Sequence, residues 1–352
     1  MGLFNFRKKN KTEVKSQEVK ILRIEKTTKD AVKIIFDSKD QNFSVGEYIP
    51  GQYIPVEIEL NGEKHRRSYS ICSSLNENLA IGVKRVESGI VSNYLNDCKE
   101  GKFLKVFKPE GKFTTHSTEG KIVCIAAGSG ITPILSIIKS NPTREFVLYY
   151  GNKTKAQTMF LEELIQLKNV VLIPYYSQEQ VDNSKTGRIT KEAFIEEIKT
   201  DLSLLQASEF FICGPHQMIK NVQEALKMFG VAENKIHFEL FTVSTEATDQ
   251  NNLTENSSVD SFNLDFTLDD EQYTLEGLNA KKTILEHLDS NGIDAPYSCR
   301  GGVCSSCKAK VLDGKVDMKV NYSLTDEEIE EGYVLTCQAL CQSNTVKITF
   351  DE

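Results

Sequence analysis

Four of the nine cysteines have a spacing that could hold a metal cluster. Cys299, Cys304 and Cys307 form a C-x4-C-x2-C run, and Cys337 follows after 29 intervening residues. Three thiolates from one loop and a fourth from elsewhere in the chain are the ligands of a compact 2Fe-2S cluster. The pair Gly301-Gly302 leaves the loop backbone free to wrap closely, so that its N–H groups can point at the sulfurs. The spacing therefore predicts these four cysteines as iron ligands.

A zinc site and a disulfide scaffold are the alternative uses of these cysteines. Zinc ribbons usually carry two C-x2-C pairs, whereas only Cys304 and Cys307 are spaced in that way here. Cys341 lies four residues beyond Cys337, and we interpret it as a packed or half-exposed thiol, because a cluster needs only four thiolates. The cysteine count is odd and no secretory signal precedes it, so a disulfide scaffold is not expected.

A second group of residues could bind a flavin. A flat isoalloxazine ring needs an aromatic face, a hydrogen bond near its N5 atom and a cation for its phosphate. Tyr69, Ser70 and Arg67 could supply these in that order, although the same run would also suit a plain solvent-facing strand. Further on, Gly89 opens a helix-like segment. Its N-terminal N–H groups and the hydroxyl of Ser92 would suit a pyrophosphate.

A third group could bind a nucleotide. Gly128 and Gly130 follow a strand-like run and open a helix with Pro133 in its first turn, where the missing N–H does no harm. A tight strand–helix turn alone would also favour glycine. Cys213-Gly214-Pro215 ends another strand of the same expected sheet, at the carboxyl edge where ligands bind. Cys213 could otherwise be an inert buried thiol.

The elements that must position these residues fall into three blocks. Up to about residue 115 the chain consists of short, β-branched segments broken by turn signals such as Asn61-Gly62. Closely spaced strands with little helix between them indicate a small antiparallel barrel. From Gly120 onward, strand-like runs alternate with helical ones up to residue 230, which indicates βαβ units and a parallel sheet.

The third block, residues 259–352, opens with two strand-like runs and continues with a short helix at residues 282–292. The segment before it, residues 242–258, has few apolar residues, and we interpret it as a linker. The expected organisation is thus a basic tail at 1–15, a β-barrel with the candidate flavin residues at 16–115, an α/β domain with the nucleotide motifs at 116–241, the linker, and a domain with the 2Fe-2S cysteine motif at 259–352.

Charge is distributed unevenly along the chain. Residues 259–352 hold 18 Asp and Glu against 8 Lys and Arg, a net charge of −10, whereas the preceding residues hold 32 acids and 34 bases, a net charge of +2. An acidic domain suggests electrostatic docking to a basic protein surface and argues against nucleic acid as its partner. No apolar run approaches the length of a membrane span, so we expect no integral membrane association. The N-terminal tail lacks the apolar core of a signal peptide, and we expect a cytoplasmic protein.

Taken in order, these motifs resemble a known family. RSYS, GSGITP, CGP and the C-x4-C-x2-C…C run are similar to the ferredoxin–NADP-reductase superfamily with a fused C-terminal plant-type ferredoxin. The run YSCRGGVCSSC and the segment AAGSGITPILSIIKS resemble the subgroup that contains the phenylacetyl-CoA epoxidase reductase subunit and the hybrid-cluster-protein reductases. The resemblance implies a multidomain fold: an antiparallel β-barrel, an α/β parallel-sheet domain and an α+β ferredoxin domain of the β-grasp type.

The resemblance also implies site residues. Those for FAD are Arg67, Tyr69, Ser70, Lys84, Gly89 and Ser92. Those for NADPH or NADH are Gly128, Gly130, Thr132, Cys213 and Pro215. Glu239 and Phe241 occupy positions that in relatives end near the flavin and nicotinamide rings, and the implied catalytic group is Ser70, Cys213 and Glu239.

Two positions depart from the family pattern. Ser88-Gly89 replaces the paired glycines that many relatives carry before the diphosphate helix. Many NADPH-using relatives have Ser-Arg after the strand that ends near Tyr176, whereas here Glu179 stands in that segment. A lost guanidinium removes a bidentate partner for the 2′-phosphate, which Arg188 or Lys153 could replace. The sequence therefore leaves both NADPH and NADH open.

These motifs predict an NAD(P)H-dependent electron-transfer reductase. A hydride would pass from nicotinamide to flavin, and single electrons from flavin to the cluster and on to a protein acceptor such as an oxygenase component or another redox protein. A reductase of small acceptors, such as free flavin or ferric chelates, is the alternative within enzymes. A redox sensor is the alternative outside them.

Overall fold

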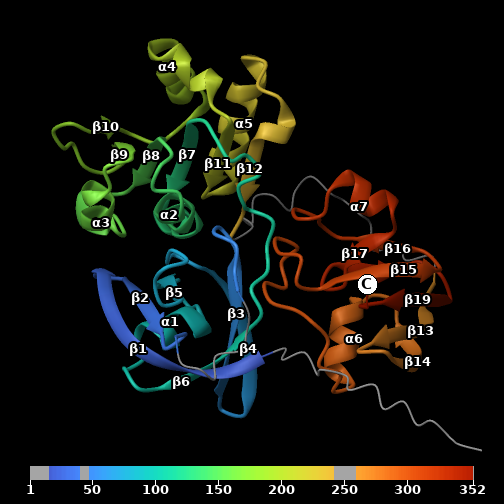
Figure 1. Ribbon diagram of the computed structural model, residues 1–352. Helices are drawn as coiled ribbons and strands as arrows, with labels where there is room; N and C mark the ends of the chain where they lie inside the picture. Colours follow the sequence, from blue (N-terminus) through green and yellow to red (C-terminus); the bar gives the residue numbers. More distant parts are fainter. Residues whose placement is uncertain (1–15, 40–46, 242–258, 352) are drawn as a thin grey trace, which may run out of the picture.

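The computed structural model describes residues 16–39, 47–241 and 259–351 (Figure 1). The predicted basic tail (1–15) and linker (242–258) lie outside these residues. Three sheets organise the chain, one for each block of the sequence. None of the helices in these described ranges is long and apolar enough to cross a membrane.

The first sheet is antiparallel, with the order β4-β3-β6-β1-β2-β5. Its elements are β1 (Ser16–Thr28), β2 (Ala31–Phe36), β3 (Tyr53–Leu60), β4 (Glu63–Ser70), β5 (Ala80–Lys84), α1 (Ile90–Asn96) and β6 (Phe103–Phe107). Asn61 and Gly62 both have positive φ, as the tight hairpin between β3 and β4 requires. A bridge between Ile71 and Ile81 joins the two edges of the sheet and begins to close it into a barrel.

The second sheet is parallel, with the order β10-β9-β8-β7-β11-β12. Its elements are β7 (Ile122–Ala127), α2 (Ile131–Ser140), β8 (Phe146–Asn152), α3 (Leu161–Gln166), β9 (Val170–Tyr176), β10 (Lys185–Thr186), α4 (Lys191–Thr200), β11 (Glu209–Cys213), α5 (His216–Met228) and β12 (Ile236–Glu239). Successive side chains of β7 are buried on opposite faces of the sheet. Cys124 packs with α2, and Val123 packs with α4 and α5. Both faces of the sheet are therefore covered, as in doubly wound nucleotide-binding domains.

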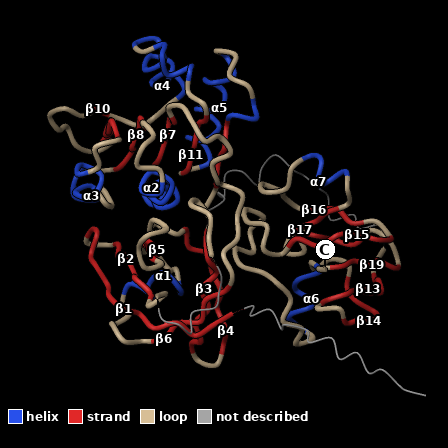
Figure 2. Tube along the Cα trace, viewed as in Figure 1, coloured by secondary structure: helices blue, strands red, loops and turns tan. Residues whose placement is uncertain are grey.

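The third unit is mixed, with the order β14-β13-β19-β15-β17 and a small sheet of β16 and β18. Its elements are β13 (Ser261–Leu268), β14 (Glu271–Asn279), α6 (Ile284–Ser290), β15 (Lys308–Asp313), β16 (Val316–Met318), α7 (Asp326–Glu330), β17 (Tyr333–Leu335), β18 (Ala339–Cys341) and β19 (Thr345–Thr349). Thr283 and Glu286 form a capping box that fixes the start of α6. Figure 2 shows this unit beside the barrel strands β3 and β4, with α7 on the side of the nucleotide domain.

Candidate functional site

The two glycine-containing nucleotide motifs meet at the carboxyl edge of the parallel sheet. Gly130 lies so close to the end of β11 that a Cβ atom there would come within 2.1 Å of the Cys213 carbonyl oxygen. Gly128 has φ +56°, in the left-handed region that glycine adopts without strain. The close approach at Gly130 and the positive φ at Gly128 explain why both positions are glycine. The close approach also places Cys213 and Pro215 beside the start of α2.

Two side chains hold this turn in shape. The hydroxyl of Thr132 donates to the Ser129 carbonyl oxygen at 2.9 Å, and that of Tyr150 donates to the Gly128 carbonyl oxygen at 2.9 Å. Thr132 is thus engaged within the turn, and its predicted contact with a nucleotide stays a prediction. The resulting turn is rigid, as a surface that must bind a diphosphate without reorganising should be.

The three residues of the implied catalytic group come together from separate domains. Glu239 on β12 is the register neighbour of Cys213 on β11, and its carboxyl group has a hydrogen bond with Ser70 at the end of barrel strand β4. Its second oxygen, Oε2, is buried without a hydrogen-bond partner among the described residues. Burial raises the pKa of Glu239 to about 8. Burial, with Glu239 nearby, also raises the pKa of Cys213 well above its usual range.

An unpaired carboxyl oxygen at the junction of two domains is a polar group that lacks a partner. Such groups are costly to bury unless something supplies the missing hydrogen bond. With pKa about 8, Glu239 is protonated at neutral pH and can donate one hydrogen bond as well as accept one. The group therefore suits a polar ring edge placed between the barrel and the nucleotide domain.

The predicted flavin residues lie on the barrel. Arg67 is exposed, and its Nη1 donates to the Arg66 carbonyl oxygen at 2.7 Å. Tyr69 packs against the barrel core, and burial raises its pKa while Arg67 opposes that shift. Lys84 ends β5, 4.0 Å from Asp30. Arg67 and Tyr69 occupy alternate positions of β4, so they share one face of the strand.

The loop before α1 is tightly built. A Cβ atom at Gly89 would lie 2.6 Å from Ser92 Oγ, so the close approach requires glycine. Ser92 Oγ accepts from the Val86 N–H at 3.2 Å and donates to the Gly89 carbonyl oxygen at 3.3 Å. Ser92 therefore shapes this loop, and its predicted contact with the flavin diphosphate stays a prediction.

Replacing Tyr69 with Ala should weaken FAD retention about two- to tenfold, because it removes an aromatic face worth about 0.5–1.5 kcal/mol beyond its buried area. Fluorescence of FAD released on dilution gives the dissociation constant. Tyr69→Phe keeps the ring and is the matched control. Equal retention of FAD in the Ala and Phe variants would mean that Tyr69 does not face the ring.

Three of the predicted iron ligands lie in the loop before β15, the fourth, Cys337, lies between β17 and β18, and the four form two pairs. Cys299 contacts Cys304, whose Sγ accepts from the Cys299 N–H at 3.5 Å, and Cys307 contacts Cys337. The Gly301 N–H donates to Cys299 Sγ at 3.4 Å. Hydrogen bonding from Cys304 and these backbone N–H groups lowers the pKa of Cys299 to about 6. The same hydrogen bond raises the pKa of its partner Cys304, so the two sulfurs share one proton between them.

The two thiol pairs can be compared with the ligand requirements of two irons and of one zinc ion. A single zinc ion draws four sulfurs to about 2.3 Å from one point, whereas two irons share four thiolates between them. Cys299 lies beside Cys304 and Cys307 beside Cys337, so each pair offers two thiolates, although no group of three or more metal-ligating side chains is gathered around one point in the described residues. Gly302 has φ +72° and packs against Val320, as a tight cluster-binding loop needs.

The fifth cysteine of this domain lies away from the two pairs. Cys341 is fully buried in β18, within the core of the third unit. Burial raises its pKa to about 12, so it stays a neutral thiol. This environment agrees with the interpretation of Cys341 as a packed side chain.

Three domain families match the chain in this order: oxidoreductase FAD-binding domain at residues 18–115, oxidoreductase NAD-binding domain at 124–224, and 2Fe-2S iron-sulfur cluster binding domain at 266–342. The chain is 36% identical over 348 residues to a subunit of the 1,2-phenylacetyl-CoA epoxidase of Escherichia coli K12, covering 94% of this chain and 96% of that protein. The chain belongs to this family of ferredoxin reductase components. It is also 32% identical over 337 residues to the ferredoxin reductase component of the 3-ketosteroid-9-alpha-monooxygenase of Rhodococcus rhodochrous, covering 92% and 93% of the two chains.

Solved structures agree on the fold of this reductase. Phthalate dioxygenase reductase is 22% identical, with a TM-score of 0.61, and the match covers 95% of this chain and 98% of that one. The predicted fold class is confirmed, as are binding domains for FAD, nicotinamide nucleotide and a 2Fe-2S cluster. The chain is an oxidoreductase of the ferredoxin-reductase type.

Sequence reasoning missed the residues that join the iron–sulfur domain to the barrel. Arg66 is buried, whereas its neighbour Arg67 is exposed, and Arg66 Nη2 donates to Asp294 Oδ1 of the iron–sulfur domain at 3.1 Å. Tyr53 Oη lies 3.3 Å from Ser306 Oγ in the cluster loop. The alternation of β4 was the available signal, because it places Arg66 and Arg67 on opposite faces.

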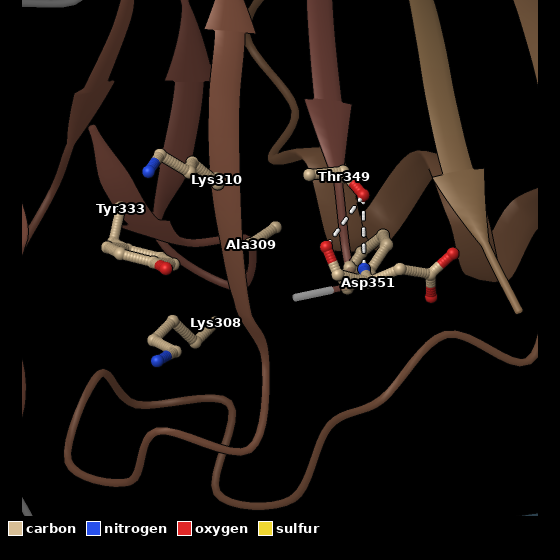
Figure 3. A pocket seen from close by; sticks show the side chains of 7 residues that line it. Lys308, Ala309, Lys310, Tyr333, Thr349 and Asp351 are labelled. Atoms are coloured by element: carbon tan, nitrogen blue, oxygen red, sulfur yellow. Dashed lines mark hydrogen bonds between the residues drawn. The ribbon is translucent and has the colours of Figure 1, made fainter. Parts of the chain in front are cut away.

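Two cavities lie away from these motifs. One of about 620 Å³ separates the β1–β2 hairpin from the loops after β8 and β9, and Lys33, Lys155 and Glu179 are among the residues lining it. The other, of about 240 Å³, lies on the iron–sulfur domain, where Lys308 and Lys310 flank the ring of Tyr333 (Figure 3). The second cavity contains none of the predicted cofactor residues.

Proposed function

We propose that this reductase takes hydride from NADH at the junction of barrel and nucleotide domain and delivers single electrons to an oxygenase component through its iron–sulfur domain. One observation carries the proposal: strand β4 touches both sites. Ser70 lies against Glu239, and two residues earlier Ser68 Oγ lies 2.6 Å from Ser298 Oγ, next to the cluster ligand Cys299. The names of relatives support the acceptor class, since they are an epoxidase subunit and monooxygenase components.

The proposed site roles follow the geometry. FAD, when bound, accepts a hydride and releases its two electrons one at a time. The proposed FAD-binding residues are Arg67, Tyr69, Ser70, Lys84, Gly89 and Ser92. The proposed nucleotide-binding residues are Gly128, Gly130, Thr132, Cys213, Pro215 and Phe241. The proposed iron ligands are Cys299, Cys304, Cys307 and Cys337.

Ser70, Cys213 and Glu239 form the proposed catalytic group. Protonated Glu239 keeps the Ser70 hydroxyl oriented and leaves Oε2 available for one further hydrogen bond. Cys213 is buried and uncharged, so it keeps water and charge away from the reacting edge. The contribution of these residues is to orient and to exclude water, while the redox chemistry belongs to the cofactors.

The purified chain tests this function. It should be brown and contain one FAD, two irons and two acid-labile sulfides per chain, and NADH should bleach both chromophores. Turnover of an oxygenase component from the same gene neighbourhood should require this protein. Full-rate reduction of free flavin or ferric chelate, without any coupling to a protein acceptor, would instead favour the small-acceptor reductase.

We also propose the domain division 16–115, 116–241 and 259–352, with a linker at 242–258. A cytoplasmic location completes the proposal.

The preference for NADH rests on Glu179. Its Oε2 accepts from the Lys155 N–H at 2.7 Å, which fixes a negative charge at the carboxyl edge of β8 and β9. A 2′-phosphate placed there would meet that charge, whereas a free ribose hydroxyl could donate to it. A relative that is 29% identical over 307 residues is named NADH oxidoreductase HCR, from Escherichia coli K12.

Replacing Glu179 with Gln should raise kcat/KM for NADPH relative to NADH by about fivefold, because unit charges 4 Å apart in water repel by about 1 kcal/mol. Gln keeps an oxygen that can accept from the Lys155 N–H. Glu162→Gln, an exposed acid lining the same cavity, is the control and should change neither value. An unaltered preference in E179Q would place the 2′-position elsewhere.

A further inference from the structure

Strand β4 presents two chemically different faces. Arg67 and Tyr69 lie on one face and are proposed to hold the flavin. Arg66 and Ser68 lie on the other, and both contact the iron–sulfur domain. Neither residue is among the proposed cofactor-binding residues, although Ser70 on the same face is, so the contacts of Arg66 and Ser68 need a separate explanation.

Arg66 is held in place by the barrel before it meets the other domain. Its side chain is only 5% exposed, and its Nε and Nη2 donate to Glu57 Oε2 at 3.0 and 2.6 Å. The guanidinium carbon lies 3.9 Å from the centroid of the Phe107 ring. Lys105 Nζ donates to the other Glu57 oxygen at 3.0 Å, so the buried carboxylate does not depend on Arg66 alone. The guanidinium group of Arg66 is thus held in a fixed orientation, and it has further N–H donors available for other partners.

Arg66 also contacts the segment of the iron–sulfur domain that leads into the cluster loop. Nη2 also donates to Asp294 Oδ1 at 3.1 Å, and the guanidinium carbon lies 4.8 Å from the Tyr297 ring centroid. Tyr297 is buried, and two residues later comes the ligand Cys299. A desolvated Arg close to two aromatic rings makes a strong and directional contact.

A second line of contacts holds the other half of the loop. Ser306, which lies between the ligands Cys304 and Cys307, donates through Oγ to Glu110 Oε2 and lies near Tyr53 Oη. Tyr53 on β3 is the register partner of Ser70 on β4. The cluster loop is therefore fixed at two separate places against the strands that carry the flavin residues. Two such contacts define an orientation, which one contact cannot do.

We propose that Arg66 is a positioning residue for electron transfer, which seats residues 294–298 on β4 and thereby fixes the cluster beside the flavin site. This inference rests on the proposed route from flavin to cluster. Arg66 is not one of the proposed cofactor-binding residues, and it acts through Asp294 and Tyr297. Loss of the contact should leave both cofactors bound but let the iron–sulfur domain move away from β4.

Asp294→Lys in the full-length holoenzyme tests the proposal, because the Asp294 side chain is 67% exposed and its replacement puts a like charge against Arg66 without disturbing a core. Asp317→Lys makes the same charge change on an exposed residue of β16 and is the matched control. Arg66→Lys keeps the charge without the fork, but it alters a buried pair and is the secondary variant.

Anaerobic stopped-flow mixing with NADH separates flavin bleaching from cluster bleaching in one trace. Asp294→Lys should slow cluster reduction at least tenfold, with flavin reduction within twofold of the parent, and Asp317→Lys should change neither. Small-angle scattering of the oxidised enzyme should show a larger radius of gyration for Asp294→Lys alone. If Asp294→Lys reduced its cluster at the rate of the parent and had the same radius of gyration, the proposal would be overturned. If the parent itself never reduces its cluster, the electron route fails, and the scattering comparison still decides whether Arg66 seats the domain.

Discussion

Replacing Cys304 with Ser should remove the cluster and leave FAD in place. Cys304 is buried in the loop of the iron–sulfur domain and contacts Cys299, so its loss breaks one of the two ligand pairs. The barrel and the iron–sulfur domain have separate cores, so loss of the cluster should not empty the flavin site. Iron content should fall to near zero, and reduction of one-electron protein acceptors should fall with it. Two-electron reduction of the flavin by NADH should persist.

Cys341→Ser is the matched control for this variant. Cys341 is fully buried among apolar side chains, and a serine hydroxyl there would cost about 1–3 kcal/mol if it found no partner. The expected result is a less stable iron–sulfur domain with near-normal iron. Iron and sulfide analysis with absorption spectra checks both variants. An empty cluster in the Cys341 variant, with Cys337→Ser still holding iron, would show that the fourth ligand is wrongly assigned.

Much of this architecture could be predicted because local sequence patterns determine it. Alternating strands and helices after residue 120 predict a parallel sheet, and β7 to β12 form one. The cysteine spacing predicts one loop with three of the four cysteines and a fourth from elsewhere, and the fold brings Cys337, between β17 and β18, beside Cys307. The helix expected at residues 282–292 is α6, whose start is fixed by the capping box at Thr283. In each case residue types and spacings along the sequence carry the signal, without any knowledge of how the domains meet.

The contacts between domains could not be predicted in this way. Arg66 and Asp294 are 228 positions apart, and their meeting depends on how two finished domains dock. The alternation of β4 places Arg66 and Arg67 on opposite faces, but it does not say which face meets the iron–sulfur domain. The same holds for Glu239, which the sequence placed in the site by resemblance alone. Its burial and its unpaired Oε2 arise where the barrel meets the nucleotide domain.

Glu239 should make stability fall as pH rises, and Glu239→Gln should remove that fall. Burial raises the pKa of the folded-state carboxyl from 4.5 to about 8. Between these two values the folded state binds more protons than the unfolded chain, so the free energy of unfolding decreases with increasing pH. The stabilisation is complete below pH 4.5 and is lost as pH rises through 8. Between about pH 6 and 9 the loss is about 2–3 kcal/mol, from about 1.4 kcal/mol per pH unit below the folded-state pKa.

Urea unfolding of both proteins at several pH values between about 6 and 9 measures this difference. Other ionisable groups are common to the two proteins, so their contributions to the difference cancel. Cys213 and Tyr53 lie near Glu239, but burial raises the pKa of each, so both stay neutral in this pH range. The free energy of unfolding of the Gln variant should therefore increase relative to that of the parent as pH rises. Flavin reduction by NADH gives a second readout: its rate should fall above about pH 8 in the parent, where the Glu239 proton is lost, and stay flat in the variant. Parallel stability curves would mean that Glu239 ionises normally, and the role of a neutral hydrogen-bonding carboxyl beside Ser70 would then be wrong.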